Sequence, residues 1–375
     1  MEWVVRIYAG LVGLFWLSIA AKTWESRKDT AWKLDPNSPV LPGLPRLRVV
    51  IPARNEAANI GACLQALSAS DHPNWAVTVF DDGSTDGTGA IAEKYGAEVL
   101  RGEEGIPPEW RGKTWALQRA TRNIQEEWIL FLDADVRVHP TCLSRTHSYA
   151  ITEKVDLLSG YGRLTMESFW EKVIQPTVGG VIVLGNPMDR VNDDQEQERV
   201  MANGQLILVR REVYEELGAH ERVKDKITED VELARLFRGN GRRQRCLMMR
   251  DLFSCRMYSS LEEIWLGWTK NFYIGLRKKR AAAAILVFFL LVYNMLPALL
   301  VPYGIWSGGE IAAWLVGLWG LMQGVRLMLD LRTGQEPFYG LLQPLGAFMV
   351  AAIVLDSMRR AATGKLVWKG RVYAA

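Results

Sequence analysis

The sequence predicts an α/β protein with a mainly parallel sheet, preceded and followed by helices that can cross a membrane. Between residues 45 and 280, short apolar runs alternate with helix-like stretches. This alternation favours right-handed crossovers and a parallel sheet that is covered by helices on both faces. On either side of this region lie apolar segments close to the roughly 20 residues that a bilayer core requires.

The first half of the alternating region supplies the expected elements in order. Residues 47–51, 76–80 and 128–132 are apolar runs of strand length, and residues 59–67 and 88–95 have the spacing of helices. In an open sheet of this kind, ligands bind beyond the carboxyl ends of the strands. We therefore expect a functional site at that edge.

The N-terminal segment, residues 3–21, is apolar except for Arg6. It has no small-residue cleavage site and is followed by basic residues between positions 22 and 28, which favours an uncleaved anchor over a signal peptide. A buried core helix is the alternative interpretation.

Three further apolar segments follow the alternating region. Residues 281–301 carry no charge and come directly after the basic run at 277–280, and residues 311–329 form a second span. Residues 337–355 are also uncharged but contain Pro344. We expect two membrane helices and a third that is broken near this proline.

Basic residues set the expected orientation. The positive-inside rule places the runs at 22–28 and 277–280 in the cytosol, so the domain between them is cytosolic and the protein is a multi-pass protein of the cell membrane. The basic tail is expected in the cytosol as well. Four full spans would place it outside, so we expect residues 337–355 to re-enter the membrane or to lie in its interface. The expected divisions are an anchor at 1–24, a globular domain at 45–275, membrane helices at 281–358 and a tail at 359–375.

Composition excludes several classes of protein. The formal charge of +3 comes without a long Lys/Arg stripe, so nucleic acid is not an expected partner. The cysteines form no CxxC pair and have no histidine at metal-site spacing, which excludes a disulfide framework or a zinc site. They are Cys63, Cys142, Cys246 and Cys255.

Three carboxylate clusters carry the expected chemistry. Asp81 and Asp82 follow the second strand, Asp133 and Asp135 follow the third, and a Glu-Asp pair opens a later helical stretch at Asp230. Bare carboxylates repel a diphosphate, but a divalent cation, Mg²⁺ or Mn²⁺, bridges the two. Asp135, alone or with Asp133, can hold such an ion, and Asp230 can accept a proton or orient an acceptor.

Each cluster also has a structural interpretation. The sequence around Asp82 is a common turn, the Asp133-Ala134-Asp135 triplet also occurs by chance, and Glu229 with Asp230 can simply favour a helix N-terminus. Their order and their positions after strands favour the functional interpretation.

Five motifs in order resemble family 2 glycosyltransferases. They are the run at 49–56 (VVIPARNE), the run at 81–86 (DDGSTD), the run at 112–117 (GKTWAL), the DxD at 133–135 and the TED at 228–230. The resemblance covers about residues 45–275. It implies a GT-A fold, which is Rossmann-like, and an inverting transfer from a nucleotide-sugar.

The resemblance also implies roles for individual residues. Nucleotide contacts are implied for Pro52, Ala53, Glu56, Asp81, Asp82 and Lys113. Asp133 and Asp135 would hold ribose, diphosphate and a Mn²⁺ or Mg²⁺ cofactor, and Asn203 with Gly204 would shape the sugar pocket. Asp230 would be the base, with Glu229 beside it.

The acceptor side departs from the processive members of the family. Their Q-x-x-R-W motif is replaced here by IWLGW at 264–268, so transfer of a single hexose is expected. The runs at 263–271 and 367–371 resemble bacterial enzymes of carotenoid and hopanoid glycosylation. The acceptor-side residues are then Trp265, Trp268, Lys270, Trp368 and Arg371, although the tail can also be a solvated basic end with an interfacial tryptophan.

These expectations combine into one function: transfer of a hexose, glucose from UDP-glucose, to a carboxyl or hydroxyl of an isoprenoid lipid such as a carotenoid acid or hopanoid. The partners are a nucleotide-sugar donor, a lipid acceptor and the bilayer. The alternatives are polyprenyl phosphate, diacylglycerol or sphingolipid as acceptor, or a non-catalytic membrane scaffold.

Overall fold

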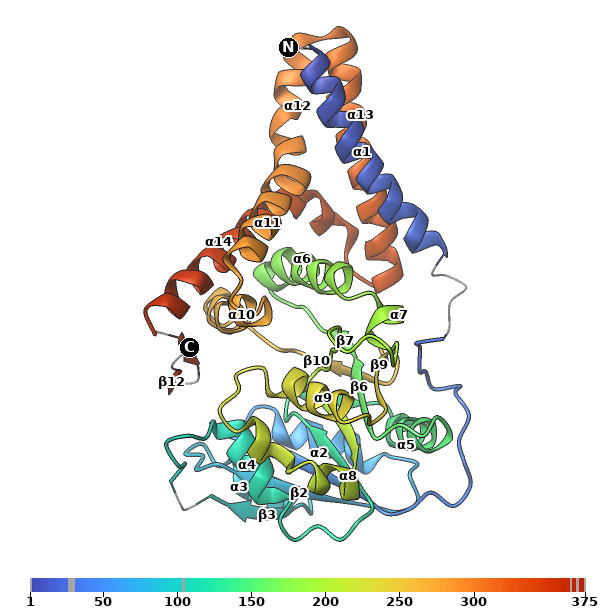
Figure 1. The fold of residues 1–375 in the computed structure, drawn as a ribbon, viewed down its shortest axis with the longest axis vertical. Helices are drawn as coiled ribbons and strands as arrows, with labels where there is room; N and C mark the ends of the chain where they lie inside the picture. The colour runs from blue at the N-terminus through green and yellow to red at the C-terminus, as the bar shows by residue number, and fades with distance from the viewer. Residues whose placement is uncertain (1, 26–30, 103–104, 365, 369–370, 374–375) are drawn as a thin grey trace. The chain divides into compact units, whose positions relative to one another are not determined.

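The computed structural model describes residues 2–25, 31–102, 105–364, 366–368 and 371–373, without the side chains of the last two segments (Figure 1). The chain divides into two compact units. One, called here the sheet unit, comprises Ala31–Thr165 and Gly185–Met257. The other, the helical unit, comprises Met1–Thr30, Met166–Leu184 and Tyr258–Ala375.

The sheet unit is built on a seven-stranded sheet with the order β3-β2-β1-β4-β8-β6-β9. All neighbouring strands are parallel except that β8 runs antiparallel to both β4 and β6. The mainly parallel α/β sheet predicted from the sequence is therefore confirmed. The strands are β1 (Leu47–Ala53), β2 (Trp75–Asp81), β3 (Glu98–Arg101), β4 (Trp128–Leu132), β6 (Leu157–Tyr161), β8 (Leu206–Arg210) and β9 (Gln244–Met248).

Alternate residues of the central strands pack against different helices. Val49 and Ile51 of β1 face a core that includes α2, α3 and α5, while Val50 faces a core that includes α4, α8 and α9. This period of two is what buries both faces of a central strand. The helices are α2 (Ile60–Ser68), α3 (Thr88–Lys94), α4 (Gly112–Ala120), α5 (Cys142–Thr152), α7 (Met188–Val191), α8 (Arg211–Glu216) and α9 (Glu229–Gly239).

A small second sheet lies directly after the DxD triplet. It has the order β5-β10-β7, from β5 (Val136–Val138), β10 (Phe253–Cys255) and β7 (Arg163–Leu164). Cys255 pairs with Val136 in the antiparallel part of this sheet. That pairing places the Cys255 thiol next to Asp135.

The helical unit contains four helices that are long and apolar enough to cross a membrane: Glu2–Glu25, Arg280–Ser307, Gly309–Thr333 and Pro337–Ala362. Its elements are α1 (Glu2–Glu25), α6 (Phe169–Gly185), α10 (Leu261–Gly275), α11 (Arg280–Phe289), α12 (Leu296–Ser307), α13 (Gly309–Thr333), α14 (Gln343–Ala362), β11 (Leu366–Trp368) and β12 (Arg371–Tyr373).

Helices α1 and α13 lie side by side and run in the same direction (Figure 1). Arg6 forms an ion pair with Glu310 near the beginning of both helices, and Arg332 donates a hydrogen bond to the Thr23 carbonyl near their ends. Between these ends, Trp16 Nε1 donates to the Tyr293 carbonyl at 3.1 Å. The helix pair α1–α13 is therefore held at both ends by contacts of charged side chains.

The segment expected to break near Pro344 begins as a 3-10 turn, Pro337–Leu342, and continues as the regular helix α14. Pro344 lies in the first turn of α14, where its missing N–H has no helical partner to lose. The discontinuity thus precedes the proline rather than interrupting a helix. In Figure 1, α14 runs obliquely to the upright group of α1, α12 and α13.

Candidate functional site

The site lies at one edge of the large sheet, where the sequence motifs converge. Strands β2, β1 and β4 are parallel neighbours, so their carboxyl ends lie at the same edge. Because β8 runs the opposite way, the residues that precede it, Asn203 and Gly204, reach this edge as well. Asp133 N donates to the Gln205 carbonyl at 3.1 Å, which links the end of β4 to the start of β8.

A hollow with about 270 Å³ of open space lies at this edge. Charged residues and Gly204 lie together with apolar side chains from α4, β4 and β8 in its lining. The lining residues are Pro52, Lys113, Leu117, Phe131, Leu132, Asp133, Gly204, Ile207, His220, Glu229 and Asp230. Six of them, Pro52, Lys113, Asp133, Gly204, Glu229 and Asp230, are residues that the sequence motifs pointed to.

Lys113 is the cation of the hollow. Its Nζ lies 2.7 Å from Asp133 Oδ1 and 3.3 Å from Glu229 Oε1, and it donates to the Gly204 carbonyl at 3.3 Å. Burial lowers the pKa of Lys113, but the negative charges of Asp133 and Glu229 outweigh burial and hold this pKa above its usual value. Lys113 therefore stays protonated and holds the ends of β4 and α9 together.

Asp230 occupies the first turn of α9, where backbone N–H groups point toward it. Its Oδ2 accepts from Gly204 N at 2.8 Å, and its Oδ1 accepts from Val231 N at 2.8 Å. Burial, followed by the charge of neighbouring Glu229, raises the pKa of Asp230 to about 6. A carboxylate with such a pKa is ionised at neutral pH and is also basic enough to accept a proton.

Asp135 is the carboxylate with an unused oxygen. Its Oδ1 is buried and has no hydrogen-bond partner among the described residues. The Cys255 thiol hydrogen-bonds to the carboxyl group, and burial together with the charge of Asp133 raises the pKa of Asp135 to about 6. An unsatisfied buried acceptor of this kind is costly unless another group approaches it.

A divalent cation fits this donor set. The described residues contain no cluster of three or more His, Cys, Asp or Glu side chains that could hold a metal ion by themselves. Asp135 offers a free oxygen and Asp133 a second carboxylate, so the other ligands of an ion here would be phosphate oxygens or water. A cation would also offset the charge that keeps the pKa of Asp135 high.

The residues after β1 and β2 form a linked pair of loops. Asp81 Oδ1 accepts from Ser84 N at 2.9 Å, and Arg54 Nη1 lies 3.6 Å from Asp82 Oδ2. Glu56, in the loop after Ala53, accepts from the Asn59 side-chain amide at 3.0 Å. Asp81, Asp82, Ala53 and Glu56 thus lie at the expected edge, but they are not part of the hollow's lining.

Asn203 and Gly204 have different functions in the turn before β8. The Asn203 amide donates to the Gly160 carbonyl at 3.1 Å and to Gln205 Oε1 at 3.0 Å, so its side chain holds the turn. A Cβ on Gly204 would lie 3.0 Å from Lys113 Nζ and 3.3 Å from Asp230 Oδ2. The absence of a side chain at Gly204 lets both charged groups approach the backbone.

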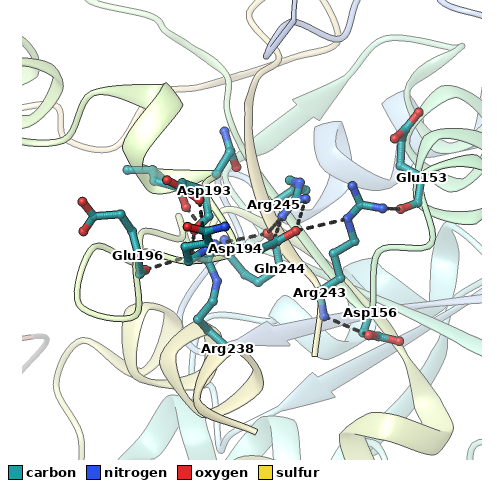
Figure 2. Close-up of polar contacts among 12 residues, drawn as sticks. Glu153, Asp156, Asp193, Asp194, Glu196, Arg238, Arg243, Gln244 and Arg245 are labelled. Carbon is teal, nitrogen blue, oxygen red and sulfur yellow. Dashed lines mark hydrogen bonds and ion pairs between the residues drawn. The ribbon is translucent and has the colours of Figure 1, made fainter. Parts of the chain in front are cut away.

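The loop that leads to this turn is anchored by a buried arginine of α9 (Figure 2). Arg238 donates to the carbonyls of Asp193 at 2.5 Å, Glu196 at 3.0 Å and Val191 at 2.8 Å. Arg245 forms a two-pronged pair with Asp194 at 2.6 and 2.8 Å. Helix α9, which carries Asp230 in its first turn, therefore also fixes the loop before Asn203.

His220 is the residue of the hollow that the sequence motifs did not identify. It lies in the short 3-10 turn Ala219–Val223, between α8 and α9, and it is buried. Leu117, Phe131, Leu132 and Ile207 were also missed as lining residues, although 128–132 was predicted as a strand. A lone histidine eight residues before the TED motif has no local pattern that distinguishes it from a core residue.

The acceptor-side residues belong to the helical unit. Trp265 Nε1 donates to Asp356 Oδ2 at 2.9 Å, and the buried Trp268 donates to Gln175 Oε1 at 2.7 Å. Lys270 follows Trp268 by two residues in α10. Trp368 and Arg371 pair in the β11–β12 ladder, but their side chains lie outside the described part of the chain.

Comparison with known proteins agrees with this arrangement. The profile of Glycosyl transferase family 2 matches residues 48–218. The chain is 27% identical over 343 residues to the 4,4'-diaponeurosporenoate glycosyltransferase of Staphylococcus aureus strain MRSA252, and 26% identical over 351 residues to that of strain USA300, covering 88% of each chain in both cases.

One solved structure shares the fold over nearly the whole chain. It is the mannosyltransferase PcManGT from Pyrobaculum calidifontis in complex with GDP-Man and Mn²⁺, with a TM-score of 0.55 and 17% identity. The match covers 94% of this chain and 99% of that one. The fold is thus an α/β fold of the GT-A type with long apolar helices at both ends of the chain.

The fold is of the GT-A type, and the family profile together with the similar enzymes identifies the chain as a glycosyltransferase. Residues 48–218 belong to glycosyltransferase family 2, and the chain is a distant homologue of the 4,4'-diaponeurosporenoate glycosyltransferases.

Proposed function

We propose that this glycosyltransferase moves one hexose, glucose from UDP-glucose, onto an isoprenoid-type lipid at the cytosolic face of the cell membrane, with inversion at the anomeric carbon. The observation that carries the proposal is the convergence of Lys113, Asp133, Glu229 and Asp230 on one hollow. The diphosphate of a nucleotide-sugar needs cations near it, and a hydroxyl acceptor needs a base such as a carboxylate.

The donor would bind across the edge formed by β1, β2 and β4. Pro52 lines the hollow, and Asp82 lies at the end of β2, where the nucleoside would rest. Lys113, held protonated between Asp133 and Glu229, would face the diphosphate. A phosphate oxygen can take over the contact that Lys113 makes with Asp133.

Asp135 and Asp133 would hold Mn²⁺ or Mg²⁺, with Oδ1 of Asp135 as the unengaged ligand. When bound, the ion offsets the charge that develops on the departing diphosphate. The support for this assignment is the donor set itself. The likeness in fold to a mannosyltransferase in complex with GDP-Man and Mn²⁺ agrees with it.

Transfer would proceed by a single displacement. The acceptor oxygen forms a bond to the anomeric carbon while the bond from that carbon to the diphosphate oxygen breaks, and the electron pair leaves with the diphosphate. A hydroxyl acceptor gives its proton to Asp230, whose carboxylate is held by Gly204 N and Val231 N. A carboxylate acceptor is already ionised at neutral pH and gives up no proton.

Two observations support a membrane lipid as acceptor. The chain has four helices of membrane-spanning length and hydropathy, which would keep the enzyme where apolar acceptors dissolve. Relatives that match 88% of the chain are 4,4'-diaponeurosporenoate glycosyltransferases, named for a carboxylic acid. A long-chain isoprenoid acid is therefore the preferred acceptor.

The test uses the full-length protein purified in detergent with Mn²⁺. UDP-glucose is offered with an isoprenoid polyene acid, with a polyprenyl phosphate or with diacylglycerol, and products are identified by mass spectrometry. We expect a glucosyl ester of the acid, and no product from an Asp135→Ala variant. Transfer only to the phosphate or to diacylglycerol would reject the isoprenoid acid, and no transfer to any of the three acceptors would reject glucose transfer from UDP-glucose as the function.

A further inference from the structure

His220 is an unassigned polar group in the hollow. Its ring is buried and lies edge-on to Phe131, with 5.1 Å between ring centroids and 88° between ring planes. It shares the hollow with Lys113, Glu229 and Asp230. A histidine buried beside charged groups needs a reason to be there, because an apolar residue would fill the same space without a polar atom to satisfy.

The two residues before His220 have an unusual backbone conformation, which sets the direction of the histidine side chain. Gly218 and Ala219 both have left-handed backbones, with φ of 83° and 52°. This conformation is unfavourable for alanine, because its Cβ comes too close to the following carbonyl oxygen. Consecutive left-handed residues turn the chain sharply between α8 and the 3-10 turn and direct His220 into the unit.

Tyr214 holds one nitrogen of the ring. Its hydroxyl lies 2.5 Å from His220 Nδ1, and the two rings are 5.5 Å apart. Among the described residues, the one hydrogen bond of the His220 side chain is this contact at Nδ1, so Nε2 is left over, and the ring lines the hollow. Nε2 is therefore the atom that a bound molecule can meet.

The protonation state of the His220 ring determines which groups of a bound molecule can hydrogen-bond to Nε2. Burial, reinforced by the charge of Lys113, lowers the pKa of His220 to about 3, so the ring is neutral at pH 7. A neutral imidazole presents at Nε2 either an N–H or a lone pair, depending on its tautomer. A sugar hydroxyl both donates and accepts, so it pairs with either form, whereas a phosphate oxygen only accepts.

We propose that His220 Nε2 hydrogen-bonds a hydroxyl of the donor sugar and so helps to select the sugar, with Tyr214 as the positioning residue that orients the ring. The inference rests on the proposed function in one respect, that the donor is a nucleotide-sugar. Asp230, the proposed base, lies beside the reacting acceptor oxygen, so the anomeric carbon of the sugar must lie near Asp230. His220 lines the same hollow as Asp230, which places the sugar hydroxyls within its reach.

The experiment compares two replacements in the full-length protein. His220→Leu keeps apolar bulk without a polar atom, while the amide of His220→Gln offers both a donor and an acceptor. His139→Gln, an exposed histidine of the same unit, is the matched control. Dissociation constants for UDP-glucose and for UDP are measured by calorimetry with Mn²⁺, alongside kcat and KM.

Loss of one hydrogen bond in a buried site predicts a fall of about 10- to 100-fold in kcat/KM and in UDP-glucose affinity for His220→Leu. UDP affinity should stay unchanged, and His220→Gln should recover part of the loss. Tyr214→Phe should lower kcat/KM in the wild type but have no further effect on it in the His220→Leu background, which a purely structural role of Tyr214 would not produce.

The inference is overturned if His220→Leu keeps the wild-type kcat/KM, or if its affinity for UDP falls as much as that for UDP-glucose. It is also overturned if the effects of Tyr214→Phe and His220→Leu on kcat/KM are additive. A wild-type enzyme that binds UDP-glucose but transfers no sugar would instead reject the proposed function. The calorimetric comparison would still decide the role of His220 in that case.

Discussion

Five ionisable side chains line the hollow: Lys113, Asp133, His220, Glu229 and Asp230. Lys113 pairs with Asp133 and Glu229, while burial is the main cause that raises the pKa of Asp230 and of nearby Asp135. One of these carboxyl groups has both oxygens held by backbone N–H groups, while the other has a buried oxygen without a partner among the described residues. This difference separates the proposed base from the proposed metal ligand.

Asp135→Asn should change stability in a pH-dependent way. Because the folded pKa, about 6, lies above the unfolded value of about 3.9, the carboxyl stabilises the fold when protonated, and this contribution is lost as pH rises through 6. The variant should therefore be more stable than metal-free wild type at pH 7.5, by on the order of 1–2 kcal/mol, and equal to it near pH 4. Thermal unfolding checks this.

Added Mn²⁺ supplies the control for the same variant. With UDP present, Mn²⁺ should raise the unfolding temperature of the wild type but not that of Asp135→Asn. An equal rise in both proteins would remove Asp135 from the proposed metal site.

Asp230→Asn tests the proposed base. On a hydroxyl acceptor we expect kcat to fall by about 10²- to 10⁴-fold, with little change in KM for UDP-glucose, because other groups hold the donor. On a carboxylic acid acceptor the fall should be much smaller, since no proton has to be removed. Steady-state kinetics with both acceptors measure the difference. Wild-type turnover on a hydroxyl acceptor would exclude Asp230 as a base.

The sequence pointed to Asp133 because it directly follows a predicted strand, and to Lys113, Glu229 and Asp230 because they lie in motifs that resemble the family. Asp133 comes immediately after β4, whose bounds match the predicted run at 128–132, and Glu229 begins α9 as expected. His220 escaped notice because its place depends on two left-handed residues and on Tyr214, which no short pattern specifies. The pairing of Lys113 with Asp133 was also invisible, since it joins residues from separate elements.

Among the secondary-structure elements, β8 has the greatest effect on the site. Its antiparallel direction brings Gly204, which precedes the strand, to the edge where β1 and β4 end. Strand direction is a tertiary property, so the apolar run that forms β8 did not reveal it. The predicted helices 59–67 and 88–95 differ from α2 and α3 by only one residue at their ends, because periodicity is a local property.

The loop between α7 and β8 depends on Arg238. Arg238→Met keeps the bulk of the side chain but removes the hydrogen bonds to the Asp193, Glu196 and Val191 carbonyls. We expect a loss of about 2–4 kcal/mol in stability and faster trypsin cleavage after Arg199, whose side chain is exposed. Digestion followed by mass spectrometry measures the cleavage rate.

Arg235→Met is the matched control, because Arg235 lies on the same helix and pairs only with nearby Glu232 among the described ion pairs. Equal cleavage rates in both variants would show that Arg238 does not anchor the loop.

For the whole molecule, the prediction concerns the path that the four long apolar helices would take through a membrane. The Arg6–Glu310 pair fixes the beginnings of α1 and α13 at one side, and the contact of Arg332 with Thr23 fixes their ends at the other. With the basic residues after α1 in the cytosol, Glu310 would face outward. Whether Pro337–Ala362 crosses or re-enters remains a prediction, although its helix is more covered by protein than the other three.

Single cysteines test this topology in a background without the four native ones, all of which are buried. In intact cells, an impermeant thiol reagent should label Glu310→Cys but neither Ala90→Cys nor Thr363→Cys, and permeabilisation should expose the last two. Labelling at position 363 in intact cells would show that Pro337–Ala362 crosses fully. Labelling at position 90 would place the sheet unit outside.

The position of α6 in the chain limits which parts of the enzyme a single recombination event can exchange. This helix lies between β7 and β8 in the sequence, yet it joins the helical unit through Gln175, which accepts from Trp268, and Lys172, which pairs with Glu336 at 2.6 Å. Neither unit is a contiguous stretch of the gene. A single crossover therefore cannot exchange the sheet unit without also exchanging part of the helical unit.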